Sequence, residues 1–169
     1  MRPIFYDITS IGSGSLSIMG RPVAGEWVSE EFAGLASAGF DVVVSLLEHA
    51  ESFELGLGEE KRFCSEAGMD FELYEIPDRG VPLNVRAFGR LCLRIHESCD
   101  GGKRVLAHCR AGIGRSGLFA ASVLLLAGFE IDEAFHVVSE SRGVEVPDTP
   151  EQVWWLRENE SEIRRGGCA

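Results

Sequence analysis

The sequence predicts an α/β protein with a mainly parallel central sheet of four to five strands flanked by helices. Short apolar, β-branched runs alternate with helical patterns along the chain, as they do in proteins built from strand–helix–strand units. One late segment is apolar on every side, which is typical of a helix in the middle of a core. The 169 residues contain no internal repeat or long linker, so residues 1–169 are expected to form one domain.

Four segments have the pattern of strands. Residues 41–47 (DVVVSLL) have the β-branched density of a buried strand, and residues 71–76 (FELYEI) alternate like a strand with one covered face. Residues 104–107 (RVLA) form a short apolar run after the turn signal Asp-Gly-Gly at 100–102. Residues 16–19 give the weakest of the four signals.

Helical patterns fill the intervals between these strands, which favours a parallel sheet covered on both faces. Residues 29–38 and 59–67 each end at a glycine, Gly39 and Gly68, a residue that suits the position just past a helix. The run at 116–129 is uncharged but shorter than the roughly 20 residues of a membrane span. The remaining helices are expected at residues 82–99, 116–127, 131–141 and 150–164.

Charge is abundant and unevenly distributed. The chain carries 27 acidic and 16 basic residues, a formal net charge of −11. That balance argues against broad nucleic-acid binding and against docking on anionic membranes, both of which need a basic surface. Residues 79–129 nevertheless hold eight bases and two acids, a local charge of +6. An acidic protein therefore keeps one basic segment.

The number of cysteines and the pattern of the first ten residues bear on the cellular compartment of the protein. Five cysteines are an odd number with no tight pairing pattern, which argues against a disulfide scaffold and favours the reducing cytoplasm. The first ten residues lack the charged-then-apolar build of a signal peptide. The sequence thus predicts a cytoplasmic protein, and we expect a monomer.

One segment concentrates the chemistry, directly after the predicted strand at 104–107. It runs from His108 to Ser116 and reads His-Cys-Arg-Ala-Gly-Ile-Gly-Arg-Ser. Gly112 and Gly114 can adopt positive φ, which lets successive backbone N–H groups converge on an anion. The following helix adds the free N–H groups of its first turn, and Arg115 adds a planar set of donors suited to phosphate.

Cys109 lies at the mouth of this positive loop. Helix N-termini and nearby cations favour the thiolate over the thiol, so the groups that bind phosphate would also activate Cys109 as a nucleophile. A merely buried thiol would not explain the arginine six positions later or the glycines between them. An accessible thiolate would also be sensitive to peroxide.

These residues resemble the signature of the cysteine-dependent protein tyrosine phosphatases, which is His-Cys, five residues, Arg, then Ser or Thr. The likeness is strong over residues 77–152 and weak before about residue 46. It implies phosphate-monoester hydrolysis through a phosphocysteine, with Cys109 as nucleophile and Arg115 as phosphate ligand. It also implies that His108 orients the loop and the thiolate, and that Ser116 assists thiolate departure unless it only starts the helix. The implied substrate-binding loop residues are Arg110, Ala111, Gly112, Ile113, Gly114 and Arg115.

A second loop, Ile-Pro-Asp-Arg-Gly-Val-Pro at 76–82, follows a predicted strand. Its Asp78 precedes Cys109 by 31 positions, the separation at which the compact dual-specificity branch of that superfamily carries its general acid. The resemblance implies that Asp78 protonates the leaving oxygen and later activates water. The alternative is an aspartate that only forms a turn after proline.

A third segment, Thr-Pro-Glu-Gln at 149–152, admits two roles for Gln152. Related phosphatases have a water-positioning glutamine in this region. The same four residues fit a capping box with proline at the first helical position, and this alternative is slightly favoured.

Other residues suggest structural roles. His49, His96 and His136 are isolated and lack metal-ligand spacing, and no metal or cofactor is expected. Cys92 and Cys99 lie on an apolar helical face and should be core residues. The arginines at 86, 90 and 94 suggest a solvated face. Arg79 and Arg110 follow the expected acid and nucleophile, where they could bind a second anionic group of the substrate.

The sequence therefore predicts a phosphatase acting on phosphotyrosine in proteins or peptides, with phosphoserine and phosphothreonine next. Phosphoinositides and other small phosphomonoesters are an alternative, although Ile113 stands where phosphoinositide-acting relatives carry lysine. A catalytically silent phosphate-binding module and a sulfur-transfer enzyme of the rhodanese kind are further alternatives. The presence of Cys109, Arg115 and Asp78 together argues against the silent module. Asp78, which has no role in sulfur transfer, argues against the rhodanese kind.

Overall fold

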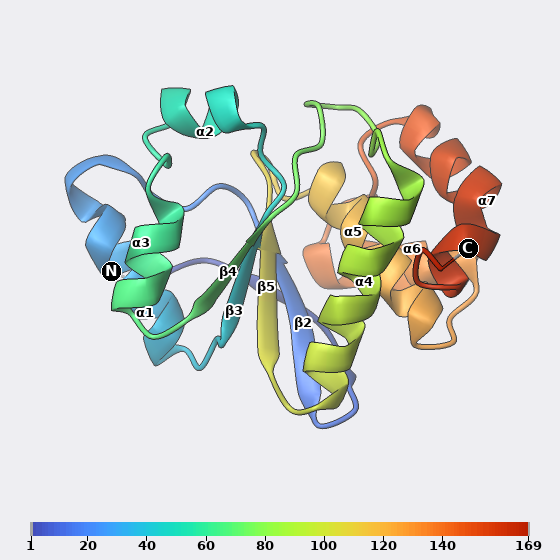
Figure 1. The fold of residues 1–169 in the computed structure, drawn as a ribbon, viewed down its shortest axis with the longest axis horizontal. Coiled ribbons are helices and arrows are strands. Elements are labelled where there is room, and N and C mark those ends of the chain that lie inside the picture. The colour runs from blue at the N-terminus through green and yellow to red at the C-terminus, as the bar shows by residue number, and fades with distance from the viewer. Residues whose placement is uncertain (1, 169) are drawn as a thin grey trace.

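The computed structural model describes residues 2–168, in which a five-stranded sheet lies between two layers of helices (Figure 1). The strand order is β1-β2-β5-β3-β4. The edge strand β1 is antiparallel to β2, and all other neighbours are parallel, so the predicted mainly parallel sheet is confirmed. The strands are β1 (Tyr6–Ile11), β2 (Gly14–Met19), β3 (Val42–Ser45), β4 (Asp70–Leu73) and β5 (Arg104–His108).

Helices cover both faces, as the alternation of strands and helices predicts. In Figure 1, α1 and α3 lie on one side of the sheet and α4, α5, α6 and α7 on the other. Every helix expected from the sequence is present, with its ends displaced by at most three residues. The helices are α1 (Val28–Ser37), α2 (His49–Glu54), α3 (Glu60–Glu66), α4 (Val85–Asp100), α5 (Arg115–Leu126), α6 (Ile131–Arg142) and α7 (Pro150–Arg164), with a 3₁₀ turn at Gly25–Trp27.

Three differences from the sequence expectation have simple causes. The sequence pattern gives no signal for β1, a polar edge strand, or for the short helix α2, which has too few residues to show a period. The strand expected over 71–76 ends at Leu73 in the structure. Its backbone still donates from Tyr74 to Ser45 (3.0 Å) and from Ile76 to Leu46 (3.2 Å), and Pro77 then ends the pairing because it has no N–H.

The central strands β2, β3 and β5 bury both faces, and their successive side chains alternate between two cores. Val42 and Val44 point into the core beneath α4–α7, while Val43 points into the core beneath α1 and α3. Helix α5 packs against α4, α6 and α7 as well as the sheet. That surrounding explains why its sequence is apolar on all sides.

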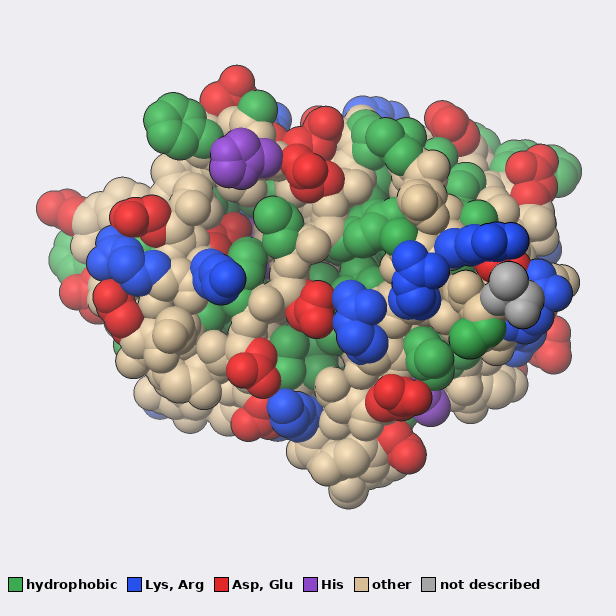
Figure 2. Space-filling view, in the orientation of Figure 1, with side chains coloured by type: hydrophobic (Ala, Val, Ile, Leu, Met, Phe, Trp, Pro, Cys, Tyr) green, Lys and Arg blue, Asp and Glu red, His purple; other side chains and the backbone are tan. Residues whose placement is uncertain are grey.

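The basic segment at 79–129 is neutralised by acids from elsewhere in the chain. Within residues 2–168, Arg90 alone of its eight bases has no carboxylate within 4.0 Å. Figure 2 shows the result on one face, where basic and acidic side chains are interspersed. The local charge of +6 is thus largely offset in the folded protein, a consequence of pairing between distant segments that composition does not show.

Among the described residues, none of the helices combines the length and apolarity needed to cross a bilayer.

Phe88 is the centre of an aromatic cluster in the larger core. It is fully buried, and its ring centroid lies 5.4 Å from that of Tyr74, 6.1 Å from Phe119 and 5.5 Å from Trp155. We expect Phe88→Ala to lower the free energy of unfolding by about 3–5 kcal/mol, because it leaves a cavity among rigid rings. Urea denaturation measures the loss. Leu83→Ala, at a side chain that is 84% exposed, should change stability by less than about 0.5 kcal/mol.

Candidate active site

The predicted site residues lie at the edge of the sheet where the parallel strands end. Strand β5 leads into the loop that begins at Cys109, β3 leads into α2, and β4 leads into the segment that carries Asp78. Figure 1 shows α2 and the segment between β4 and α4 above this edge. Since carboxyl ends of parallel strands meet at one edge, segments far apart in sequence converge there.

The loop between β5 and α5 curls around the Cys109 sulfur. The N–H of Gly112 donates to Cys109 Sγ at 3.3 Å, and the cysteine side chain is buried. Gly112 has φ of +71°, as the sequence led us to expect. A Cβ at this position would lie 2.7 Å from the backbone nitrogen of Gly20, which follows β2. Glycine is therefore required here for both backbone conformation and close packing.

Gly114 does not adopt the positive φ that the sequence analysis considered for it. Its φ is −75°, at the start of α5. Glycine is favoured there by space instead, because a Cβ would lie 3.0 Å from Asp148 Cβ and 3.1 Å from Gln152 Nε2. The loop is thus packed against the N-terminus of α7.

Arg115 is buried and held by two carboxylates and one carbonyl. Its Nη1 and Nη2 donate to the two oxygens of Glu51 at 2.8 and 2.9 Å. Nη2 also donates to Asp78 Oδ1 at 3.1 Å, and Nη1 donates to the carbonyl of Ile76 at 3.0 Å. Asp78 is about half exposed, so it is the one acid of the pair that reaches solvent.

The pKa shifts of this cluster favour the charged forms. The hydrogen bond from Arg115 holds the pKa of Glu51 below its ordinary value, although burial opposes the shift. Burial is the largest single influence on the pKa of Arg115 and lowers it, but the hydrogen bond to Glu51 and the negative charges nearby together outweigh burial, and the net shift is upward. Glu51 and Arg115 therefore form a buried ion pair that holds α2 against the loop between β5 and α5.

Both arginines expected at the rim already pair with carboxylates of the chain. Arg110 Nε lies 3.2 Å from Glu51 Oε1, and Arg79 Nη1 lies 2.8 Å from Asp148 Oδ2. A contact of Arg110 with substrate stays a prediction. Neither side chain is a free cation at the rim.

His108 is buried behind the loop and bonds on both sides of its ring. Its Nε2 lies 2.7 Å from Glu60 Oε2, and its Nδ1 lies 3.3 Å from the carbonyl of Cys109. Glu60 is itself buried. The Ser116 hydroxyl is also buried, and within residues 2–168 its oxygen has no hydrogen-bond partner.

Gln152 has the capping geometry that the sequence pattern favours. Its backbone N–H donates to the Thr149 hydroxyl oxygen at 3.3 Å, and its side-chain oxygen accepts from the backbone N–H of Thr149 at 3.2 Å. Its Nε2 donates to the carbonyl of Gly80 at 3.0 Å, which ties α7 to the Asp78 segment. A water-positioning role for this buried amide stays a prediction.

Sequence reasoning missed Glu51, Glu60 and Arg142. Arg142 donates to the carbonyls of Gly112 (3.0 Å) and Ala111 (3.3 Å), which fixes the loop from outside. The sequence offers one signal for Glu51, because this acidic residue follows soon after a central strand, at the edge of the sheet where sites form. Nothing in the sequence pattern points to Glu60.

The other buried thiols and the remaining histidines lie outside this cluster. Burial raises the pKa of Cys64 and of Cys99 to about 12, and raises that of Cys92 further. These three are core residues, as predicted for Cys92 and Cys99. Across residues 2–168, no three His, Cys, Asp or Glu side chains are grouped as metal ligands would be.

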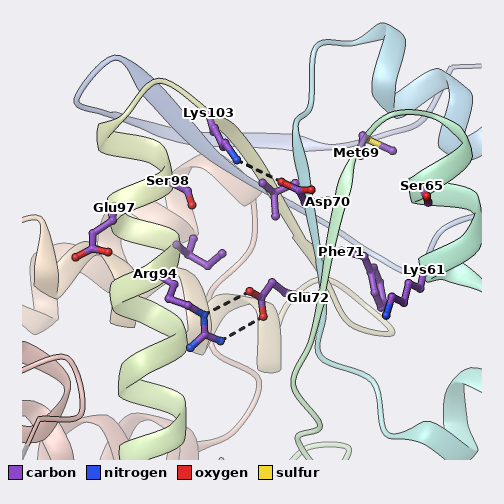
Figure 3. A pocket seen from close by; sticks show the side chains of 12 residues that line it. Lys61, Ser65, Met69, Asp70, Phe71, Glu72, Arg94, Glu97, Ser98 and Lys103 are labelled. Carbon is purple, nitrogen blue, oxygen red and sulfur yellow. Dashed lines mark hydrogen bonds and ion pairs between the residues drawn. The ribbon is translucent and has the colours of Figure 1, made fainter.

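A cavity of about 740 Å³ lies away from the Cys109 loop, beside the edge strand β4 (Figure 3). Two ion pairs connect β4 to the far side of this cavity, Arg94 to Glu72 at 3.2 Å and Lys103 to Asp70 at 3.3 Å. Its lining contains no cysteine or histidine. We therefore assign no chemistry to it.

Comparison with known proteins gives a consistent result. Residues 17–129 match the family model described as a DSP-PTPase phosphatase of polymorphic toxin systems. A protein of Invertebrate iridescent virus 6, named as a tyrosine phosphatase, is 34% identical over 55 residues, which are 32% of this chain and 39% of that protein. The match thus spans well under half of the viral relative.

Solved structures share the fold over nearly the whole chain. Kinase associated phosphatase superposes with a TM-score of 0.86 at 18% identity, covering 96% of this chain and 97% of that one. The active form of Tk-PTP gives a TM-score of 0.78 at 28% identity, covering 95% and 99%. The predicted resemblance is confirmed.

The Glu51–Arg115 pair should contribute pH-dependent stability. We expect Glu51→Gln to lower the free energy of unfolding by about 3 kcal/mol at pH 7, because it leaves the buried Arg115 charge without its main partner. The folded-state pKa of Glu51 is lowered from 4.5. The contribution is therefore complete above pH 4.5 and is lost as the pH falls through the folded-state pKa.

Urea denaturation of both proteins at several pH values tests this expectation. Glu54→Gln, an exposed change on the same helix, is the matched control and should be nearly neutral. An equal cost of Glu51→Gln at pH 7 and at pH 3 would contradict the assignment.

Proposed function

The chain belongs to the family of DSP-PTPase phosphatases, and from that premise we propose that it hydrolyses phosphotyrosine in proteins or peptides through a phosphocysteine. Phosphoserine and phosphothreonine are the next substrates. We propose one catalytic domain over residues 1–169, acting as a monomer in the cytoplasm.

One observation carries the proposal. The Asp78 carboxylate lies 3.1 Å from the Arg115 guanidinium, 37 residues away in sequence, at the loop that curls around Cys109. The residues that we propose as nucleophile, phosphate ligand and acid thus lie in one cluster. Hydrolysis through a phosphocysteine uses these three functions together.

In the first step, Cys109 Sγ attacks phosphorus in line with the leaving oxygen. The S–P bond forms as the P–O bond breaks, and Asp78 transfers its proton to the leaving oxygen. The Gly112 N–H, 3.3 Å from Cys109 Sγ, stabilises the attacking thiolate before the bond forms. The product alcohol or phenol then leaves.

In the second step, water attacks the phosphocysteine. Asp78, now ionised, accepts a proton from the water, the S–P bond breaks, and the electron pair returns to Cys109 Sγ. The Ser116 hydroxyl, buried and without a partner in the described structure, donates to the departing thiolate. Inorganic phosphate leaves and the enzyme is regenerated.

Phosphate binding requires a rearrangement around Arg115. Both terminal nitrogens are engaged by Glu51, Asp78 and the Ile76 carbonyl. We propose that the phosphate displaces the Asp78 carboxylate from Nη2 while Glu51 stays in place. Arg115 and the loop N–H groups then supply the positive charge that a metal supplies in other phosphatases.

His108 and Gln152 act as positioning residues in this proposal. Glu60 fixes the His108 ring, whose Nδ1 lies beside the Cys109 carbonyl. Gln152 links the Asp78 segment to α7 through the Gly80 carbonyl. Its amide also lies next to Gly114, within reach of the loop that would hold the phosphate.

Cys109→Ser should reduce hydrolysis of para-nitrophenyl phosphate by at least about 1,000-fold, because the hydroxyl is not ionised at neutral pH. Initial rates give the ratio, with Cys168→Ser, an exposed thiol, as the matched control. Equal rates for wild type and Cys109→Ser would contradict catalysis by Cys109 and would favour the alternative of a catalytically silent phosphate-binding module. Transfer of thiosulfate sulfur to cyanide, with no phosphate release, would indicate the rhodanese-like alternative.

Asp78→Asn should separate the two functions of this carboxylate. It removes the proton donor, so kcat for a phosphotyrosyl peptide should fall by about 10²–10⁴. It also removes a negative charge from Arg115, so inorganic phosphate should inhibit the variant at a lower concentration than it inhibits wild type. Steady-state kinetics with phosphate as competitor measure both, and Asp148→Asn serves as a charge-matched control at the rim.

Unchanged kcat in Asp78→Asn would overturn the acid role. Para-nitrophenyl phosphate sharpens the test, because its leaving group needs little protonation. The loss with this substrate should be smaller than the loss with the peptide.

A further inference from the structure

A pocket of about 360 Å³ adjoins the Cys109 loop on the side of β1 and β2. Three arginines, Arg2, Arg21 and Arg142, line it together with one acid, Glu31. Glu31 is buried, and its Oε2 accepts the backbone N–H of Val23 at 2.7 Å. The pocket is therefore strongly basic in a chain whose net charge is −11.

These arginines differ from most cations of the protein in having no carboxylate partner. Of the 16 basic residues, eleven lie within 4.0 Å of an acidic side chain. Among residues 2–168, the basic side chains outside such pairs are those of Lys61, Arg90 and the three arginines of the pocket. A folded acidic protein has thus gathered unpaired arginines at one place.

The pocket and the Cys109 loop share a wall. Ala111 of the loop lines the pocket, and Arg21 donates its backbone N–H to the carbonyl of Arg110 at 3.0 Å. Strand β2 is parallel to β5, so Arg21 follows a strand that ends at the same edge of the sheet. Strand β1 is antiparallel to β2, so the residues that precede it reach this edge too.

Arg142 is held rigidly between the loop and the pocket. Its guanidinium stacks over the Tyr6 ring at 4.2 Å and donates to the carbonyls of Gly112 and Ala111. These bonds use Nε and Nη2, and Nη1 has no hydrogen-bond partner among the described residues. Arg21 and Arg2 are exposed, with donors available to a ligand.

We infer that this arginine pocket, lined by Arg2, Arg21 and Arg142, binds a second anionic group of a peptide substrate whose phosphotyrosine occupies the Cys109 loop. The inference rests on the proposed function and specifies its substrate class. The second group is a phosphate or carboxylate on a residue near the phosphorylated one. Arg21 and Arg2 bind it, and Arg142 fixes the wall between the two sites.

A peptide fits this pocket better than a lipid headgroup in a membrane. Docking on an anionic bilayer needs a broad basic surface, and the remaining basic residues of the chain are mostly paired. Apolar side chains beside the arginines, Ile4 at 74% exposed and Val23 at 38%, offer contacts to neighbouring peptide residues. A short anionic peptide therefore matches both the charge and the size of the pocket.

Paired phosphotyrosyl peptides test the inference. One peptide carries a non-hydrolysable phosphonate, scanned along the residues on either side of the phosphotyrosine, and its partner carries alanine there. For the best position, wild type should show a kcat/KM ratio of about tenfold in favour of the phosphonate, mostly through KM. Arg21→Ala should bring the ratio close to one, and Arg21→Glu should bring it below one.

Arg90→Ala is the matched control, because it removes an unpaired, exposed arginine on α4 outside the pocket. It should keep the wild-type ratio. The inference is overturned if Arg21→Ala keeps that ratio, or if Arg90→Ala lowers it equally. It is also overturned if phosphatidylinositol phosphate in phosphatidylcholine vesicles is preferred to the phosphonate peptide in an Arg21-dependent manner.

A binding measurement separates failure of this inference from failure of the proposed function. In Cys109→Ser, calorimetry should give tighter binding of the phosphonate peptide than of its alanine partner, and Arg21→Ala in that background should abolish the difference. Hydrolysis that depends on Cys109 but is equally fast for the phosphonate peptide and its alanine partner would support the proposed function and contradict the inference about the pocket. Binding without any hydrolysis by wild type would do the reverse.

Discussion

The buried charge of Arg115 is the constraint on which the rest of the site depends. A guanidinium that is almost fully removed from water needs partners that arrive in fixed geometry, because an uncompensated buried charge is very costly. Glu51 arrives from the helix after β3, and Asp78 and the Ile76 carbonyl arrive from the segment after β4. The Arg115 side chain thereby constrains the positions of the segments that follow three strands, β3, β4 and β5.

The same constraint explains why the site is formed by a mainly parallel sheet. Parallel strands end at one edge, so a nucleophile loop after β5 and acids after its neighbours need no long excursions to meet. Close packing then fixes the details. Gly112 lies directly against the backbone after β2, and Gly114 lies against the start of α7, so the loop is held on both sides by elements that carry no reacting atom.

The sequence was sufficient for every helix except the short α2, for the central strands and for the Cys109–Ser116 loop, because each of these has a periodic or motif signal of its own. It was insufficient where a residue acts through a distant partner. Glu51 and Glu60 look like ordinary acids until the fold buries them against Arg115 and His108. The local positive charge of residues 79–129 is likewise largely neutralised in the folded protein, because acidic residues from other segments pair with its bases. Glycine is favoured at position 114 because a Cβ would crowd its neighbours, and not because the backbone has a positive φ there.

The open edge of the sheet at β4 also has a consequence for association between molecules. A bare edge strand invites backbone pairing with another chain, and proteins commonly block it with charge. Here Glu72 and Asp70 alternate along β4 and are joined to Arg94 and Lys103 across the cavity of Figure 3. A foreign strand that paired with β4 would have to place its own side chains beside these charged groups, which disfavours an apolar partner. The β4 edge of the sheet is therefore protected by charge against edge-to-edge growth into aggregates.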